Sequence, residues 1–131
     1  MHSILVRDYM DRNPHAINQL ASVREAIGVL VNEGITGAPV IDDSKTLVGF
    51  ISEHDCIRQL LNDAFYYDES AAIGAIMRTD LKSVTPDTSI LTIAEAMANG
   101  PPKNYPVVDN GKLVGLISRA HVLRALLTVN D

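Results

Sequence analysis

Two junctions in the sequence carry polar side chains at a spacing that suits ligand binding. The segment GFISEHD (49–55) places Ser52 three residues before Asp55, and GLISRAH (115–121) places Ser118 three residues before His121. Each junction runs from a strand-like apolar stretch into a helix-like one. A serine at such a boundary lies beside the unpaired N–H groups of the helix start, where an anion can be held. A carboxylate three residues later can accept hydrogen bonds from ligand hydroxyl groups.

The same spacing also has a purely structural explanation. Ser52 followed by Asp55 approximates a capping box, in which the acidic side chain accepts a hydrogen bond from the backbone N–H of the serine. The spacing alone favours this cap over a ligand site. At the second junction His121 could hydrogen-bond a hydroxyl, or contact a phosphate when protonated. Arg119 is a further candidate anion contact, although a lone arginine at a helix start is more often only solvated.

The two junctions belong to an internal repeat, which has to be recognised before the fold is inferred. Matching residues are separated by 67 positions as far as Asp109 and by 66 afterwards, so the second copy has lost one residue in a turn. The matches are Met10 with Met77, Ser22 with Ser89, Asn32 with Asn99, Pro39 with Pro106, Val40 with Val107, Asp42 with Asp109, Gly49 with Gly115, Ile51 with Ile117, Ser52 with Ser118 and Arg58 with Arg124.

Each copy contains the apolar periodicity of an amphipathic helix. The spacing i, i+3, i+4, i+7, i+8 follows Ser22 in one copy and Ser89 in the other, and both serines are plausible N-caps. The later helices follow the two junctions. The apolar positions are Val23, Ala26, Ile27, Leu30 and Val31, then Ile90, Ile93, Ala94, Met97 and Ala98, and in the later helices Ile57, Leu60, Leu61, Val122, Leu123, Leu126 and Leu127.

A tight turn precedes the last strand of each copy. In the second copy Asn110-Gly111 lies between two β-rich runs, and this pair tolerates the positive φ angles of a two-residue hairpin. The first copy uses the longer DDSKT. The sequence of each half therefore predicts, in order, a short strand, a helix, a strand, a turn, a strand and a helix. We expect NDAFYYDES (62–70) to connect the halves and residues 71–77 to form a short helix.

Composition narrows the classes of protein. With 131 residues, 47% hydrophobic and 21% charged, the chain has the balance of a folded globular protein. A net charge of -5 argues against binding to a nucleic acid backbone. No apolar run approaches the length that crosses a bilayer, so we expect no membrane insertion. The single cysteine fits a reducing compartment, and we expect a cytoplasmic location.

Catalytic and metal-binding patterns are not found. Cys56 and His54 are two residues apart, which prevents them from facing each other on a helix. The histidines His2, His15, His54 and His121 lack the spacing of a metal site. We therefore expect a binding protein, with no enzyme activity and no bound metal or required cofactor.

Taken together, these patterns resemble a known family. The segments DYM, GAPVID and LVGFISEHD, with their second copies AIM, NYPVVD and LVGLISRAH, are similar to a tandem cystathionine-β-synthase (CBS) domain pair, the Bateman module. The resemblance extends from about Val6 to Leu127. It implies an α/β (α+β) fold of two pseudo-symmetric domains, 1–66 and 67–131. Each would be a small three-stranded sheet with two packed helices, and the sheets would pair across a central cleft.

The resemblance also implies a function and a set of ligand contacts. Family members bind adenosyl ligands such as AMP, ADP, ATP or S-adenosylmethionine between the paired domains, and their ribose-binding acid occupies the position of Asp55. His121 departs from that pattern, which puts the ribose contact of the second site in doubt. Further contacts implied by position are Ala16, Ile17, Thr36, Ala38, Ser83, Val84, Thr85, Lys103, Asn104 and Tyr105, beside Ser52, Asp55, Ser118, Arg119 and His121.

For several of these positions core packing is an equally good explanation. The apolar members could simply fill the interior, and Tyr105 could stack on an adenine or fill the hydrophobic interface. Lys103 follows two prolines, so its segment is stiff and its cation would cost less entropy to hold against a phosphate.

Two functions from different classes remain open. The first is a sensor that binds an adenosyl ligand and modulates an unidentified effector protein. The second is a ligand-free dimerisation or interaction module with vestigial clefts. In either case we expect a homodimer through the outer helices, because these carry more apolar residues than one chain covers. A monomer, with the leucines covered by 62–70 and the termini, is the alternative. The residues concerned are Leu60, Leu61, Leu126, Leu127, Val29 and Met97.

Overall fold

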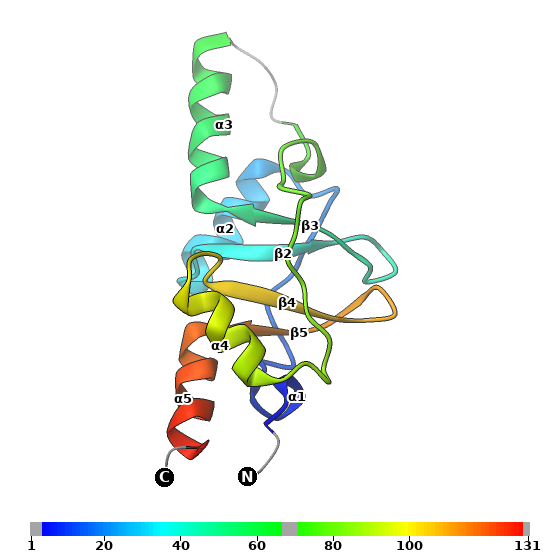
Figure 1. Cartoon of the computed structure of the whole chain (residues 1–131). Helices are drawn as coiled ribbons and strands as arrows, with labels where there is room; N and C mark the ends of the chain where they lie inside the picture. Colours follow the sequence, from blue (N-terminus) through cyan, green and yellow to red (C-terminus); the bar gives the residue numbers. More distant parts are fainter. Residues whose placement is uncertain (1–3, 67–70, 130–131) are drawn as a thin grey trace. The chain divides into compact units, whose positions relative to one another are not determined.

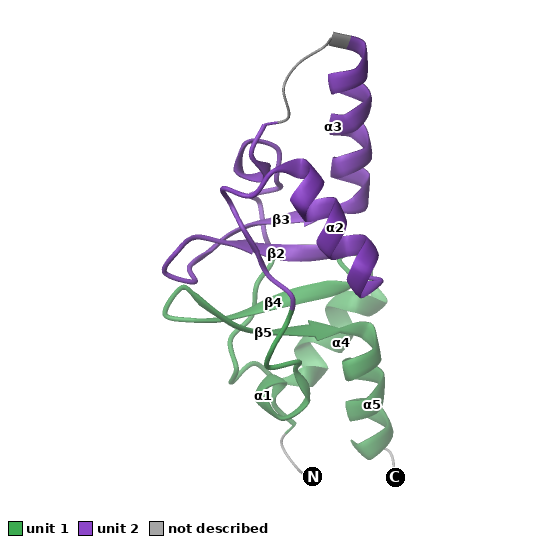
Figure 2. Ribbon diagram, turned by 180° about the vertical axis from the view of Figure 1, so that it is seen from behind, with its two compact units in different colours: residues 1–14, 82–131 green, residues 15–81 purple. Residues whose placement is uncertain are grey.

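The structure is a computed structural model that describes residues 4–66 and 71–129. The chain divides into two compact units (Figure 2). One unit comprises residues 15–81. The other combines residues 1–14 with residues 82–131.

The unit 15–81 is built on a three-stranded sheet of order β1-β2-β3, of which Figure 1 labels β2 and β3. β1 is parallel to β2, whereas β2 and β3 form an antiparallel pair. The helices α2 and α3 pack on each other, and α3 begins directly where β3 ends. The elements are β1 (Ile17–Asn18), α2 (Val23–Glu33), β2 (Gly37–Ile41), β3 (Leu47–Ser52), α3 (Glu53–Tyr66) and the 3-10 helix η1 (Ile73–Ala75).

The unit formed by residues 1–14 and 82–131 repeats this plan. β4 and β5 are antiparallel, and α5 begins directly where β5 ends. The helix α5 contacts both α4 and α1. The elements are α1 (Val6–Tyr9), α4 (Ile90–Ala98), β4 (Asn104–Asp109), β5 (Lys112–Ser118) and α5 (Arg119–Val129). The chain thus has a mixed α/β fold with two small sheets.

The segment that precedes each repeat belongs to the unit of the other repeat. Asp11 forms a bridge with Leu116 of β5, and its repeat equivalent Arg78 forms the matching bridge with Phe50 of β3. As a result, the compact units differ from the expected domains 1–66 and 67–131. The physical reason is that the segment before each repeat supplies hydrogen-bond partners to the edge of a strand that is distant in sequence. The Asp11 N–H donates to the Leu116 carbonyl, and the Leu116 N–H donates to the Asp11 carbonyl.

The two hydrophobic cores use corresponding positions of the repeat. Val23 corresponds to Ile90, Ile51 to Ile117, and the buried thiol-bearing Cys56 to Val122. The unit 15–81 buries Ile17, Val23, Ala26, Leu30, Ala38, Val40, Ile51, Cys56 and Ile73. The other unit buries Ile4, Val6, Ile90, Ile93, Tyr105, Val107, Ile117, Val122 and Ala125.

The predicted caps and hairpin are confirmed. Ser22 accepts a hydrogen bond from the Glu25 N–H, and the Glu25 carboxylate accepts one from the Ser22 N–H, which completes a capping box at α2. Ser89 accepts from the Leu91 N–H at α4. The turn residues Asn110 and Gly111 have φ angles of 52° and 78°. Positive φ at both central residues is typical of a type I′ hairpin.

Two expectations about local structure require correction. The third strand of the second half is reduced to a single parallel bridge between Val84 and Val107. In the first half the Gln19 N–H extends the strand by donating to Ile41, but the corresponding residue is Pro86, which has no N–H to donate. The expected connector 62–70 is also partly helical, since α3 continues to Tyr66. Residues 67–70 lie outside the described part of the chain.

Candidate functional site

The α3 junction forms a complete capping box around Ser52. One carboxylate oxygen of Asp55, Oδ2, accepts hydrogen bonds from the Ser52 N–H at 3.0 Å and from the Ser52 hydroxyl at 2.8 Å. In return the Asp55 N–H donates to Ser52 Oγ at 3.2 Å. Both side chains are half-buried. The bonds hold the carboxylate in a fixed orientation, with its other oxygen, Oδ1, available to accept further hydrogen bonds.

The α5 junction places His121 where the first junction has Asp55. The Ser118 N–H donates to His121 Nδ1 at 3.0 Å, and the Ser118 hydroxyl lies 2.9 Å from the same nitrogen. A nitrogen that accepts an N–H bond carries no proton of its own. His121 is therefore a neutral imidazole whose proton is on Nε2.

The surroundings of His121 favour this neutral form. Partial burial, followed by the charge of Arg124 on the same helix, lowers the pKa of His121 below its usual value of 6.5. The carboxylate of Asp11, on the segment bridged to β5, acts in the opposite direction and raises the pKa. Burial and Arg124 outweigh it. The expected contact of a protonated His121 with a phosphate would thus require conditions that also break the cap.

The backbone N–H groups of the two helix starts are satisfied differently. In α3 the Glu53 N–H donates to the Thr36 carbonyl at 2.9 Å, and the Asp55 N–H is used by Ser52. The equivalent groups in α5 are the N–H groups of Arg119 and His121. Within the described residues of that unit, neither has an acceptor outside the helix. Since an α-helix leaves its first N–H groups without internal partners, the α5 start retains free donors.

The structure places the remaining predicted contacts in two groups. Ile17, Ala38 and Tyr105 belong to the cores, and Val84 packs against one of them. The others are exposed or half-buried. Gly37 pairs with Ser52 and Asn104 pairs with Ser118, which brings the segments before β2 and β4 to their junctions. The accessible residues are Ala16, Thr36, Ser83, Thr85, Lys103 and Asn104.

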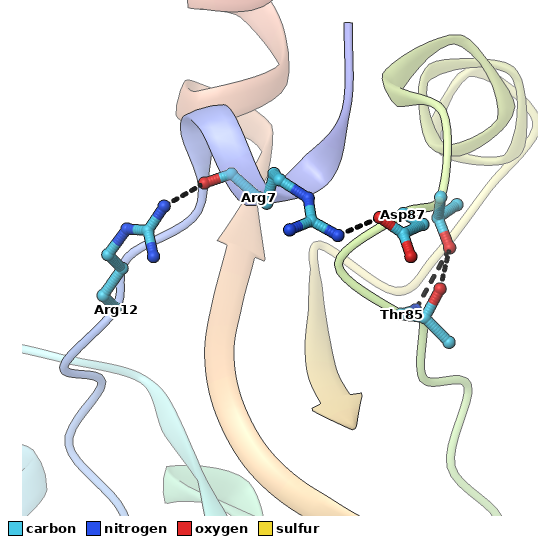
Figure 3. A network of polar contacts seen from close by, with 5 residues as sticks. Arg7, Arg12, Thr85 and Asp87 are labelled. Atoms are coloured by element: carbon cyan, nitrogen blue, oxygen red, sulfur yellow. Dashed lines mark hydrogen bonds and ion pairs between the residues drawn. The ribbon is translucent and has the colours of Figure 1, made fainter. Parts of the chain in front are cut away.

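Thr85 lies in a turn that is held by α1 (Figure 3). The Thr88 hydroxyl accepts from the Thr85 N–H at 3.1 Å and lies 3.2 Å from the Thr85 hydroxyl. Arg7 forms an ion pair with Asp87 of the same turn, and the Arg7 N–H donates to Pro86. These contacts fix the Thr85 backbone. Sequence reasoning missed Thr88, although a second threonine three residues later could have indicated it.

A pocket of about 400 Å³ lies between α2 and α3. Its walls are mainly apolar, and Thr36 and Glu53 supply polar groups at the end near the junction. Burial, followed by the nearby Asp55 carboxylate, raises the pKa of the Cys56 thiol, which also lines the pocket. A raised pKa leaves little thiolate, so the group is a poor nucleophile.

Exposed apolar side chains extend along α3 and α5. Ile57, Leu61 and Phe65 follow one another at a spacing of four residues on α3, and Phe65 is 77% exposed. In α5 the corresponding residues Leu123 and Leu127 are also exposed. By contrast, Val29, Met97 and Leu126, which we expected to widen the outer surface, pack partly against their own cores.

Two further kinds of feature are absent from the described part of the chain. In residues 4–66 and 71–129, histidine, cysteine and acidic side chains do not gather in a group that could hold a metal ion. Over the same residues, none of the helices is both long enough and apolar enough to cross a membrane.

Comparison with known proteins identifies the repeat. The family model of the CBS domain matches the chain twice, over residues 6–62 and 73–128. The uncharacterized protein MJ1225 of Methanocaldococcus jannaschii is 31% identical over 121 residues, which cover 92% of this chain. The aligned part is 42% of that relative, so the chain spans less than half of its length.

Solved structures share the fold over nearly the whole chain. The structure of CBSX2 from Arabidopsis thaliana in complex with AMP has a TM-score of 0.84 and 31% identity, and the match covers 98% of this chain and 99% of that one. The CBS domain pair of the protein MJ0100, in complex with 5′-methylthioadenosine and S-adenosyl-L-methionine, has a TM-score of 0.79. At 24% identity, with 99% of this chain and 100% of that chain covered, it shows the shared fold alone.

Proposed function

Because the chain belongs to the CBS domain family and contains a tandem pair, we propose that it is a non-catalytic regulatory module that binds an adenosyl ligand. The ligand class includes AMP, ADP, ATP and S-adenosylmethionine, and AMP is the first choice because the CBSX2 structure that is 31% identical contains it. Ligand binding would shift the conformation of the module and so modulate an effector protein. The single free Cys56 supports a cytoplasmic location for this activity.

The observation that carries this proposal is the oriented carboxylate of Asp55. Its Oδ2 is bound by Ser52, while within the described residues Oδ1 has no hydrogen-bond partner. A fixed acceptor of this kind suits the two hydroxyl groups of a ribose, since little side-chain entropy is lost when they bind. The capping role and the ligand role therefore use different oxygens of one side chain.

Thermal shift and titration calorimetry test the proposal. A ligand at about a hundred times its dissociation constant stabilises the fold by about 2.7 kcal/mol, which raises the melting temperature by several degrees. We expect this shift with AMP or another adenosyl ligand. A flat response to all of them would refute the sensor function.

Two variants of Asp55 separate ligand binding from capping. Asp55→Asn keeps an oxygen that can cap Ser52 but presents an N–H donor to the ligand, so we expect a loss of affinity of about tenfold to a hundredfold at unchanged stability. Asp55→Ala should lose both the affinity and about 1 kcal/mol of cap stability. Equal ligand affinity in wild type and Asp55→Asn would show that Oδ1 does not bind the ribose.

The alternative function is a ligand-free interaction module. It is favoured by His121, which stands where the first junction has the acid Asp55 and is bound to Ser118. The flat thermal response described above, together with a defined oligomer, would support this alternative.

Homodimerisation through the outer helices is part of both functions. The pocket between α2 and α3 shares Ile57 with the exposed apolar stripe of Ile57, Leu61 and Phe65 on the same unit. Surfaces of this kind usually mark interfaces. We expect light scattering to give twice the chain mass of 14.2 kDa, and Leu61→Glu to give the chain mass. Lys45→Glu, a charge reversal in the first hairpin turn, is the matched control and should remain dimeric. A wild-type mass of 14.2 kDa would exclude the dimer.

A further inference from the structure

The exposed faces of α3 and α5 begin with opposite charges and continue with the same kind of apolar side chain. Residues four apart lie on the same face of a helix. Each helix therefore presents one exposed face that starts with a charged residue and is followed by two large aliphatic residues. At corresponding positions of the repeat, the α3 face consists of Glu53, Ile57 and Leu61, and the α5 face consists of Arg119, Leu123 and Leu127.

The difference in charge extends over the whole of both helices. α3 contains three acidic residues and one arginine, whereas α5 contains two arginines and no acidic residue. The helices that pack beside them do not cancel this difference. α2 adds two acidic residues and one arginine, and α4 adds one acidic residue. The helix pair α2 and α3 is therefore net negative, and the helix pair α4 and α5 is net positive.

The pocket between α2 and α3 suits the α5 face of a second copy. Ile57 lines this pocket, and Glu53 supplies a carboxylate at the end near the junction. Among the described residues that form its walls, none is basic. An occupant with a protruding aliphatic side chain and a nearby cation is complementary to these walls. The α5 face has both, because Leu123 lies one helical turn after Arg119.

We propose that the homodimer is antiparallel, with the α3 face of each copy packed against the α5 face of the other. The inference rests on the proposed function, because it specifies the arrangement of the homodimer expected there. Twofold symmetry forms the same contact twice. A parallel dimer would pack α3 on α3 and α5 on α5, which brings like charges together in both contacts. Apolar burial is similar in the two arrangements, so the charges select the antiparallel one.

Reversal of single charges tests the arrangement through the sign of its effect. Sedimentation of the full chain without ligand measures the dimer dissociation constant. We expect Glu53→Arg and Arg119→Glu each to raise this constant about threefold to tenfold, since like charges then meet. The chain that carries both substitutions should return to the wild-type value, because its α3 and α5 faces have only exchanged signs. Lys45→Glu, in the first hairpin turn, is the matched control and should have no effect.

A parallel dimer responds in the opposite direction. There each single reversal reduces the repulsion between like helices, so the dimer should become tighter. Single variants that dimerise as tightly as wild type, or more tightly, would overturn the antiparallel arrangement.

Crosslinking between copies reports the arrangement directly. In a Cys56→Val background, Leu61→Cys places a thiol on the α3 face, and Leu127→Cys places one at the corresponding position of the α5 face. The two variants carry different tags, and they are treated with a short thiol-to-thiol crosslinker separately and as a mixture. We expect a crosslinked product only in the mixture, with one copy of each variant. Crosslinked dimers of either variant alone would overturn the inference.

These outcomes are distinct from a failure of the proposed function. A wild-type chain that sediments as a monomer would exclude the homodimer and its arrangement together. A dimer that crosslinks through α3 alone would exclude only the arrangement. Binding of an adenosyl ligand is measured separately, by the thermal shift, and does not depend on either result.

Discussion

Met10 packs directly over Gly115 of β5, at the point where the N-terminal segment crosses that strand. A Cβ atom on Gly115 would lie 2.6 Å from Met10 Sδ and 2.9 Å from the carbonyl oxygen of Asp11. The arrangement recurs in the other unit, where a Cβ on Gly49 would lie 2.7 Å from Met77 Cγ. In each repeat, the glycine of the strand thus provides the space that the crossing segment occupies.

Replacement of Gly115 should therefore weaken the unit to which residues 1–14 belong. We expect Gly115→Ala to lower the free energy of unfolding by about 1 to 3 kcal/mol, because the methyl group meets backbone that cannot easily move. Urea denaturation measures the change. Gly28→Ala is the matched control: nothing lies within 4 Å of that position in α2. There the alanine should raise stability by about 0.5 to 1 kcal/mol. Equal effects of the two substitutions would contradict the close packing at Gly115.

The two serine caps should differ in strength. Ser22→Ala removes a reciprocal capping box, and we expect a loss of about 1 to 2 kcal/mol in the free energy of unfolding. Ser89→Ala removes a single 3.2 Å hydrogen bond and should cost about 0.5 to 1 kcal/mol. Chemical denaturation of both variants under the same conditions compares them. A larger loss for Ser89→Ala would show that the capping box at α2 adds nothing.

The stability of the fold should decrease in mildly acidic solution because of His121. Its pKa in the folded chain lies below the unfolded value of 6.5, so between these values the unfolded chain binds more protons. The contribution of neutral His121 to stability is complete above the pKa that this residue has in the unfolded chain. It is lost as the pH falls through the pKa of His121 in the folded chain. Urea midpoints measured from about pH 7.5 to about pH 5 should fall more steeply for wild type than for His121→Asn, which does not titrate. Parallel curves of urea midpoint against pH for the two proteins would contradict this role of His121.

Cys56 should behave as a core residue. Its side chain is 2% exposed and its pKa is raised by burial, so the native chain should react with a thiol reagent far more slowly than the chain in urea. The absorbance of the thiolate that the reagent releases measures the reaction rate of the native chain and of the chain in urea. Since Val122 fills the corresponding position, Cys56→Val should change stability by less than about 1.5 kcal/mol. Fast modification of the native chain would instead indicate an accessible, reactive thiol.

Much of the local structure could be predicted because its causes are local. The helices α2 and α4 follow their apolar spacing and their serine caps, and the hairpin follows from Asn110-Gly111. The reduced third strand could also have been predicted, since Pro86 stands where a strand N–H is required. The continuation of α3 to Tyr66 was harder to predict, because the polar and aromatic residues of this segment suit a connector as well as an exposed helical turn.

The sequence by itself determined the repeat, the helix–strand–strand–helix order shared by its two copies, the CBS family and the two unequal junctions, because each depends on residue types at fixed spacing. Only the tertiary structure decided which strand each leading segment completes. Asp11 and Leu116 are far apart in the chain, and no periodicity specifies their pairing. It also decided that His121 caps Ser118 through Nδ1. The N–H groups of Glu53 and Asp55 have acceptors outside their helix, whereas within the described residues those of Arg119 and His121 have none. Hydrogen-bond partners depend on the positions of atoms brought together by folding, whereas spacing fixes only which residues can form them.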